Sequence, residues 1–351
     1  MIKNHNNFFN LAFNLAKINL GKTKSNPSVG CVIVKNSSVI SSGYTSINGR
    51  PHAEANALNK KINFYGSDLY VTLEPCTHYG VTPPCTNIIK DKKINNVYYS
   101  FNDVDLRTKK KANLLLKKNN IRVFRKNLYK YNNFYQSYFL NKRNLIPLVD
   151  AKIAVSKDYY SINKKSKWIT NILSRNRVHL IRSEYDSIIS TSTSINKDNS
   201  LLNCRLEGFD NNKPDLIIID LNLKIKNNLH LFNLSKKRRI IIITAIKKSA
   251  KKNFLQKKGV QFLQVNSLKK KNDFISLFQI LKKRGFNRIL VESGLTFLNV
   301  LLKNKLIFNL YLFKSLTKLG TNGFNNSSAK FIKELKSLNR VKVNLNGENL
   351  Y

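Results

Sequence analysis

Acidic residues are scarce in this sequence: 19 Asp and Glu stand against 62 Lys and Arg, a formal net charge of +43. Such an excess favours a polyanionic partner such as RNA when the basic residues gather on one face. Here they are spread along the whole chain in short lysine runs, beside abundant asparagine and isoleucine. We attribute this pattern to a drift toward AT-rich codons and expect no nucleic-acid partner.

Long apolar runs are also absent, and no stretch of about 18 residues could span a bilayer as a helix. The N-terminus lacks the continuous apolar segment and small-residue cleavage site of a signal peptide. We therefore expect a cytoplasmic protein with no membrane partner. Only four cysteines occur, and in the cytosol such thiols stay reduced and can bind metal.

The length of 351 residues corresponds to about two domains of ordinary size. In the first, short apolar or β-branched runs predict four strands, at 29–35, 68–73, 95–100 and 121–125. Helices are predicted at 8–20, at 53–61 and after Cys85, and a fourth in the lysine-rich stretch between the last two strands. Alternating helices and strands predict an α/β layered sandwich.

The second half repeats this alternation after a break at 141–147 that is rich in charge and asparagine and contains proline. Apolar runs predict five strands, at 148–155, 215–220, 238–244, 260–265 and 288–292. Helical periodicity predicts three helices, at 175–182, 273–283 and 296–304. We therefore assign a first domain to 1–143 and a second to 144–351, both of the α/β class.

One group of residues has the composition of a metal centre. His52 and Glu54 stand at the start of a predicted helix, and Cys76 and Cys85 follow a predicted strand. Catalytic zinc takes three protein ligands and keeps one open position for water. His52, Cys76 and Cys85 meet that count, so we predict that they bind one Zn²⁺ ion. Glu54 is predicted to be catalytic, moving a proton from the activated water to a leaving amine.

The pattern of these residues is typical of a deaminase, because nucleobase deaminases carry H-x-E and P-C-x-x-C. The spacing differs from that pattern: eight residues separate the two cysteines here, where nucleic-acid deaminases have two. Two non-catalytic interpretations stay open: a closed site with His78 as the fourth ligand, and unrelated buried cysteines and histidines. Cys31 and Cys204 are expected to be buried structural residues, because free cysteine behaves as a small apolar side chain.

The segments around these residues resemble the bifunctional deaminase–reductase family of riboflavin biosynthesis. The resemblance is carried by TKSNPSVGCVIVK (23–35), GYTSINGRPHAEANAL (43–58) and YVTLEPCTHYGVTPPCTNII (70–89). It implies a cytidine-deaminase-like three-layer sandwich in which Asn26 lines the pyrimidine pocket. The stretch at 102–110 keeps Asp103 but lacks the prolines and glycines of the family.

The second half is similar to the reductase domain of that family, which has a dihydrofolate-reductase-like fold. The similarity lies in Lys152, Ser156 and Asp158, and in the segments at 164–170, 190–205 and 291–302. It implies that NADPH contacts Ala154, Trp168, Ser194, Asp198, Gly294, Leu295, Thr296, Phe297, Leu298, Asn299 and Val300. It also implies that the phosphoribosyl substrate contacts Ser166, Arg182, Leu202, Arg205 and Glu292.

Elementary chemistry agrees with parts of this assignment. A glycine turn that opens a helix, as at Gly294, presents free N–H groups that suit a phosphate. The planar guanidinium groups of Arg182 and Arg205 suit the same ligand. The sequence contains no G-x-G-x-x-G motif, so a Rossmann dinucleotide site is not expected.

The leading hypothesis is a two-step enzyme that acts on a phosphorylated pyrimidine. The resemblance implies deamination of a diaminopyrimidinone ribosyl phosphate, followed by reduction of the ribosyl group to ribityl with NADPH. One alternative keeps the deaminase but makes the second domain a non-catalytic scaffold, since Tyr159 and Ser293 replace glycines of the family. A second alternative, based on the charge, is a tRNA-editing deaminase. Assembly into a homo-oligomer is left open.

Overall fold

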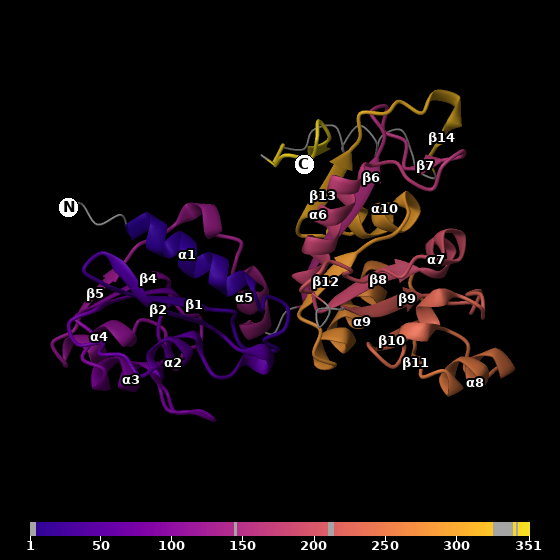
Figure 1. The fold of residues 1–351 in the computed structure, drawn as a ribbon. Coiled ribbons are helices and arrows are strands. Elements are labelled where there is room, and N and C mark those ends of the chain that lie inside the picture. Colours follow the sequence, from indigo (N-terminus) through magenta and orange to yellow (C-terminus); the bar gives the residue numbers. More distant parts are fainter. Residues whose placement is uncertain (1–4, 144–145, 210–213, 326–339, 342) are drawn as a thin grey trace. The chain divides into compact units, whose positions relative to one another are not determined.

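Two separate main sheets organise the chain, one in each of two units. The computed structural model describes residues 5–143, 146–209, 214–325, 340–341 and 343–351. Contacts divide the chain into Met1–Leu145 and Ile146–Tyr351 (Figure 1). The predicted boundary between 143 and 144 falls at the edge of the described residues.

The first unit is built on a five-stranded sheet with the order β2-β1-β3-β4-β5. Its strands are β1 (Gly30–Lys35), β2 (Ser38–Tyr44), β3 (Asp68–Leu73), β4 (Asn96–Phe101) and β5 (Arg122–Arg125). Strand β1 runs antiparallel to β2 and β3, whereas β3, β4 and β5 are parallel. The parallel strands bring their carboxyl ends to one edge of the sheet.

Helices cover both faces of this sheet (Figure 1). They are α1 (His5–Lys17), α2 (Ala53–Leu58), α3 (Cys85–Asp91), α4 (Ala112–Lys117) and α5 (Gln136–Lys142). Side chains alternate across a strand, so Val32 packs with Phe9 of α1 while Ile33 packs with Ala57 of α2. The unit is therefore a three-layer sandwich, as predicted.

The second unit contains an eight-stranded sheet with the order β11-β10-β9-β8-β12-β6-β13-β15, parallel except at β15. The strands are β6 (Leu148–Val155), β8 (Ser187–Thr191), β9 (Asp215–Ile219), β10 (Ile240–Thr244), β11 (Gln261–Gln264), β12 (Arg288–Val291), β13 (Leu310–Lys314) and β15 (Asn349–Leu350). A separate antiparallel pair joins β7 (Ile162–Asn163) to β14 (Gly323–Phe324).

Apolar runs such as Ile240–Thr244 are buried on both sides, which is typical of parallel strands. The helices are α6 (Ile172–Ser183), α7 (Ser192–Asp198), α8 (Ala250–Lys257), α9 (Lys271–Lys283) and α10 (Leu295–Lys303). Residues of α9 and α10 share one core with Ile241, and residues of α6, α7 and α8 share another with Ile242. The mixed α/β class predicted for both halves is confirmed.

The differences from prediction lie at polar helix starts and in several strands. Helix α6 begins at Ile172, before the predicted start, because the Asn171 side chain accepts a hydrogen bond from the Ser174 N–H at 2.9 Å. The stretch at 190–205, for which neither a strand nor a helix is predicted, contains the end of β8 and all of α7. Thr191 caps α7 by accepting from the Ser194 N–H at 3.3 Å. The elements that were not predicted are strands β2, β7, β8, β13, β14 and β15 and helices α7 and α8.

No helix in the described part of the chain is both long enough and apolar enough to cross a membrane.

Candidate active sites

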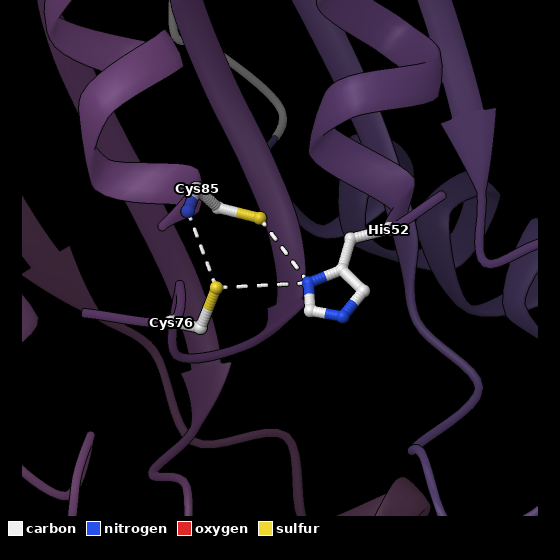
Figure 2. A group of neighbouring side chains, drawn as sticks. All are labelled: His52, Cys76 and Cys85. Atoms are coloured by element: carbon white, nitrogen blue, oxygen red, sulfur yellow. Dashed lines mark hydrogen bonds between the residues drawn. The ribbon is translucent and has the colours of Figure 1, made fainter. Parts of the chain in front are cut away.

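The three predicted metal ligands converge although they come from distant segments (Figure 2). His52 precedes the first residue of α2, Cys85 begins α3, and Cys76 lies just beyond β3. Nδ1 of His52 lies 3.6 Å from Sγ of Cys76 and 3.4 Å from Sγ of Cys85. All three ligand atoms lie within 4.8 Å of one another. The backbone N–H of Cys85 also donates to Sγ of Cys76 at 3.2 Å.

This donor set fits zinc. A tetrahedral ion with bonds of about 2.05 Å to nitrogen and about 2.3 Å to sulfur holds those atoms roughly 3.6 Å apart. The hydrogen bond with Cys85 lowers the pKa of Cys76 to about 4, while the same pairing raises the pKa of Cys85. The pairing therefore favours the thiolate form of one of the two cysteines, which is the form that binds metal.

Glu54 lies in the first turn of α2, two residues beyond His52. Its side chain is buried, with 4% exposure. Burial, and then the negative charge of Cys76, raise the pKa of Glu54 to about 7. A carboxyl group that titrates near neutrality is suited both to accept and to release a proton.

The other candidate ligands lie elsewhere. His78 contacts Oγ1 of Thr108 through Nδ1 at 3.1 Å and is not part of the three-residue metal group found among the described residues. Cys31 and Cys204 are buried, as expected for structural residues. The geometry therefore favours the open three-ligand site over the closed one.

Asn26 lies against the segment that leads to His52. Its side-chain amide donates to the Gly49 carbonyl at 3.3 Å. Gly49 has a φ of +89°, and a Cβ there would approach Nδ2 of Asn26 to 2.4 Å. Only glycine fits this close approach, which sets the main chain beside Asn26 just before the metal ligand.

Glu74 is a site-organising residue that the sequence analysis missed. Its carboxylate accepts hydrogen bonds from the backbone N–H groups of Asp103, Lys110 and Ala112, at 3.2, 3.0 and 3.2 Å. These bonds hold the loop that lacks the prolines and glycines of the family. The signal that could have found it is a carboxylate directly before Pro75 and Cys76 in a chain so poor in acidic residues.

In the second unit, Arg182 and Glu292 meet at the carboxyl end of β12. Arg182 donates from Nε and Nη2 to the two carboxylate oxygens of Glu292, at 2.6 and 2.9 Å. Burial acts to raise the pKa of Glu292, but the positive charge of Arg182 outweighs it and holds this pKa below its usual value. Nζ of Lys152 lies 3.8 Å from Oε2 of Glu292. The sequence motif containing Lys152 did not indicate this contact, because Glu292 is distant in sequence.

Ser194 and Gly294 also come together. The N–H of Gly294, which precedes α10, donates to Oγ of Ser194 at 3.2 Å. These residues follow β8 and β12, which are neighbouring parallel strands. Ligands of open α/β sheets bind beyond such carboxyl ends, so the pair lies at the edge of the sheet that this class of fold uses for ligands.

Ser166, Trp168 and Asp198 form a further group. The Trp168 N–H donates to Oγ of Ser166 at 3.2 Å, and Nζ of Lys167 donates to the main-chain carbonyl of Asp198 at 2.7 Å. The Trp168 side chain is 52% exposed and packs against Arg175, whose guanidinium carbon lies 4.7 Å from the ring centre. An indole in this position is open to a ligand.

The remaining residues predicted to contact NADPH or the substrate differ in which of their groups a ligand could reach. Arg205 donates from Nη1 to Oδ1 of Asn203 at 2.7 Å, and the Leu202 carbonyl accepts from Nη1 of Arg238 at 2.7 Å. Leu295 and Leu298 belong to the hydrophobic core, so only their backbone groups are available to a ligand. The rest are exposed or partly buried: Ala154, Thr296, Phe297, Asn299 and Val300.

Fold and site together define an α/β unit that carries a three-residue metal group beside a buried carboxylate, joined in sequence to a second α/β unit. Family models match both parts. The cytidine and deoxycytidylate deaminase zinc-binding region matches residues 2–101, and the RibD C-terminal domain matches residues 147–322.

Relatives match the chain over its length. Riboflavin biosynthesis protein RibD of Aquifex aeolicus is 30% identical, covering 98% of this chain and 96% of its own. RibD of Acinetobacter baumannii has a TM-score of 0.81 at 26% identity, covering 100% of this chain and 98% of its own. The deaminase/reductase from Thermotoga maritima has a TM-score of 0.79 at 26% identity, covering 99% and 97%.

The chain belongs to the RibD family of bifunctional riboflavin biosynthesis enzymes. It is accordingly a deaminase and a reductase, and the predicted family and fold are confirmed. The scaffold-only second domain and the tRNA-editing deaminase gain no support.

Substitution of either cysteine should remove the metal. We expect about one zinc ion per chain in the purified protein, and a content near zero in Cys76→Ser and Cys85→Ser, because each loses a thiolate ligand. Elemental analysis of the dialysed proteins measures this. Cys204→Ser, a buried cysteine of the other unit, is the matched control and should keep its zinc. Full zinc content in either ligand variant would contradict the assignment.

Proposed function

We propose that this chain deaminates 2,5-diamino-6-ribosylamino-4(3H)-pyrimidinone 5′-phosphate and then reduces the ribosyl group of the product to ribityl with NADPH. The convergence of His52, Cys76 and Cys85 beside buried Glu54 carries the first half of this proposal. Similarity to the Thermotoga maritima protein, a diaminohydroxyphosphoribosylaminopyrimidine deaminase and 5-amino-6-(5-phosphoribosylamino)uracil reductase, supports the choice of substrates. The four free cysteines agree with a reducing, cytoplasmic location.

In the deaminase unit, His52, Cys76 and Cys85 would hold Zn²⁺, which lowers the pKa of a bound water to about 7. Glu54 accepts a proton from the attacking water and passes it to the amino group, which leaves as ammonia. Oxygen thus replaces nitrogen on the ring carbon, and no redox partner is needed. Asn26, fixed against Gly49, holds the pyrimidine in place.

In the reductase unit, the start of α10 at Gly294 and the hydroxyl of Ser194 offer N–H and O–H groups for the phosphates of NADPH. The exposed indole of Trp168 offers an apolar face to the same cofactor. Both Arg182 and Arg205 could bind the substrate phosphate. The bidentate pair with Glu292 already occupies two donors of Arg182, so we assign the phosphate to Arg205. The ribosyl group gains a hydride from NADPH and a proton. This two-electron reduction converts the closed ribosyl ring into the open ribityl chain.

Replacement of Glu54 should separate metal binding from deamination. We expect Glu54→Gln to lower ammonia release by about 10²- to 10⁴-fold, the range for loss of a general acid–base, while zinc content stays at the wild-type level. Ammonia is measured with the phosphorylated diaminopyrimidinone as substrate. NADPH oxidation with the deaminated substrate should be unchanged, which serves as the internal control. Wild-type ammonia release in this variant would overturn the role of Glu54.

A bulky side chain at Gly294 should affect the reductase alone. A Cβ there would lie 3.8 Å from Oγ of Ser194, an ordinary contact, so the fold should tolerate the change. We expect Gly294→Val to raise the KM for NADPH by about tenfold or more, since cofactor phosphates lose hydrogen bonds at the helix start. Gly294→Ala should show a smaller effect, and ammonia release should stay unchanged in both. An unaltered KM in the valine variant would place the cofactor elsewhere.

A further inference from the structure

The proposed substrate of the deaminase carries a 5′-phosphate, yet the loop closest to the metal ligands has no cation to bind it. The eight residues between Cys76 and Cys85 are THYGVTPP, without lysine or arginine. A phosphate held near this loop therefore needs a positive charge from another segment.

Arg50 supplies such a charge at the edge of the site. It follows Gly49, which Asn26 holds, and precedes the metal ligand His52 by two residues. Its Nη1 donates to Oγ1 of Thr82, within the cysteine loop. One guanidinium thus connects the segment beside the pyrimidine contact to the loop between the cysteines.

The Arg50 guanidinium is accessible to a ligand. The side chain is only partly buried. Within the described part of the chain, its guanidinium hydrogen-bonds to Thr82 alone and has no ion pair. Most of its N–H donors therefore remain available to a ligand.

Arg107, another arginine near this loop, is already paired. The Thr77 hydroxyl contacts the main-chain carbonyl of Arg107 at 3.0 Å. The Arg107 guanidinium, however, donates from Nε and Nη2 to the two oxygens of Asp105 at 2.9 and 2.6 Å. A phosphate would have to displace that carboxylate, whereas Arg50 has no acidic partner to lose among the residues that the structure describes.

We propose that Arg50 binds the 5′-phosphate of the deaminase substrate and makes this site selective for phosphorylated pyrimidines. The inference rests on the proposed function, because it takes the substrate from there. The planar guanidinium donates two parallel hydrogen bonds to phosphate oxygens. The bond to Thr82 fixes the side chain against the cysteine loop before the substrate arrives, so less side-chain freedom is lost on binding.

The test compares ammonia release from the phosphorylated diaminopyrimidinone and from its dephosphorylated form. We expect Arg50→Gln to lower kcat/KM for the phosphorylated compound by about 10- to 100-fold, as for loss of charged hydrogen bonds. The value for the dephosphorylated compound should change by less than about twofold, since it makes no such bond. Arg50→Lys should fall between, because lysine keeps the charge but not the planar fork.

Lys109→Gln is the matched control, since it removes one positive charge from an exposed residue of the segment that contacts Thr77. It should keep the wild-type preference, and zinc content should be equal in all variants. An Arg50→Gln protein that keeps the preference, or loses both activities equally with zinc in place, would overturn the inference. Absence of ammonia release from the wild-type protein would instead refute the proposed function.

Discussion

The deaminase unit depends on the meeting of one imidazole nitrogen and two sulfur atoms at the starts of two helices. His52 and Cys85 are fixed because α2 and α3 begin at these positions, and Cys76 is fixed because β3 ends just before it. Separations of 3.4 and 3.6 Å from nitrogen to each sulfur suit a tetrahedral ion. The same helix start buries Glu54, so one local arrangement provides both the metal ligands and the proton carrier.

The second unit is organised around a buried charge cluster. Removing two charges such as those of Arg182 and Glu292 from water costs free energy that can exceed the gain from their attraction, so a pair of this kind is poor evidence of stabilisation. Its geometry is nevertheless well defined, with two parallel hydrogen bonds and Lys152 at 3.8 Å. We interpret the cluster as a means of holding a carboxylate in a fixed orientation at the carboxyl edge of the sheet.

Much of the fold could be predicted because its signals are local. The apolar run DLYVTL coincides with β3, and the periodicity before Lys283 matches the end of α9. Strand β8 and helix α7 were missed because small polar residues dominate that stretch, and the Thr191 cap depends on a side-chain hydrogen bond. Sequence spacing also identified the three residues that converge as a metal group. It could not identify Glu74 or the partner of Lys152, whose contacts join segments distant in sequence.

The most direct test of this account is X-ray absorption at the zinc edge of the purified, full-length protein. We predict two sulfur neighbours at about 2.3 Å and two lighter neighbours at about 2.0–2.1 Å, of which one is the His52 nitrogen and the other a water oxygen. The water should be replaceable by an added substrate analogue. A shell without two sulfurs, or one filled by four protein ligands, would contradict the open three-ligand centre.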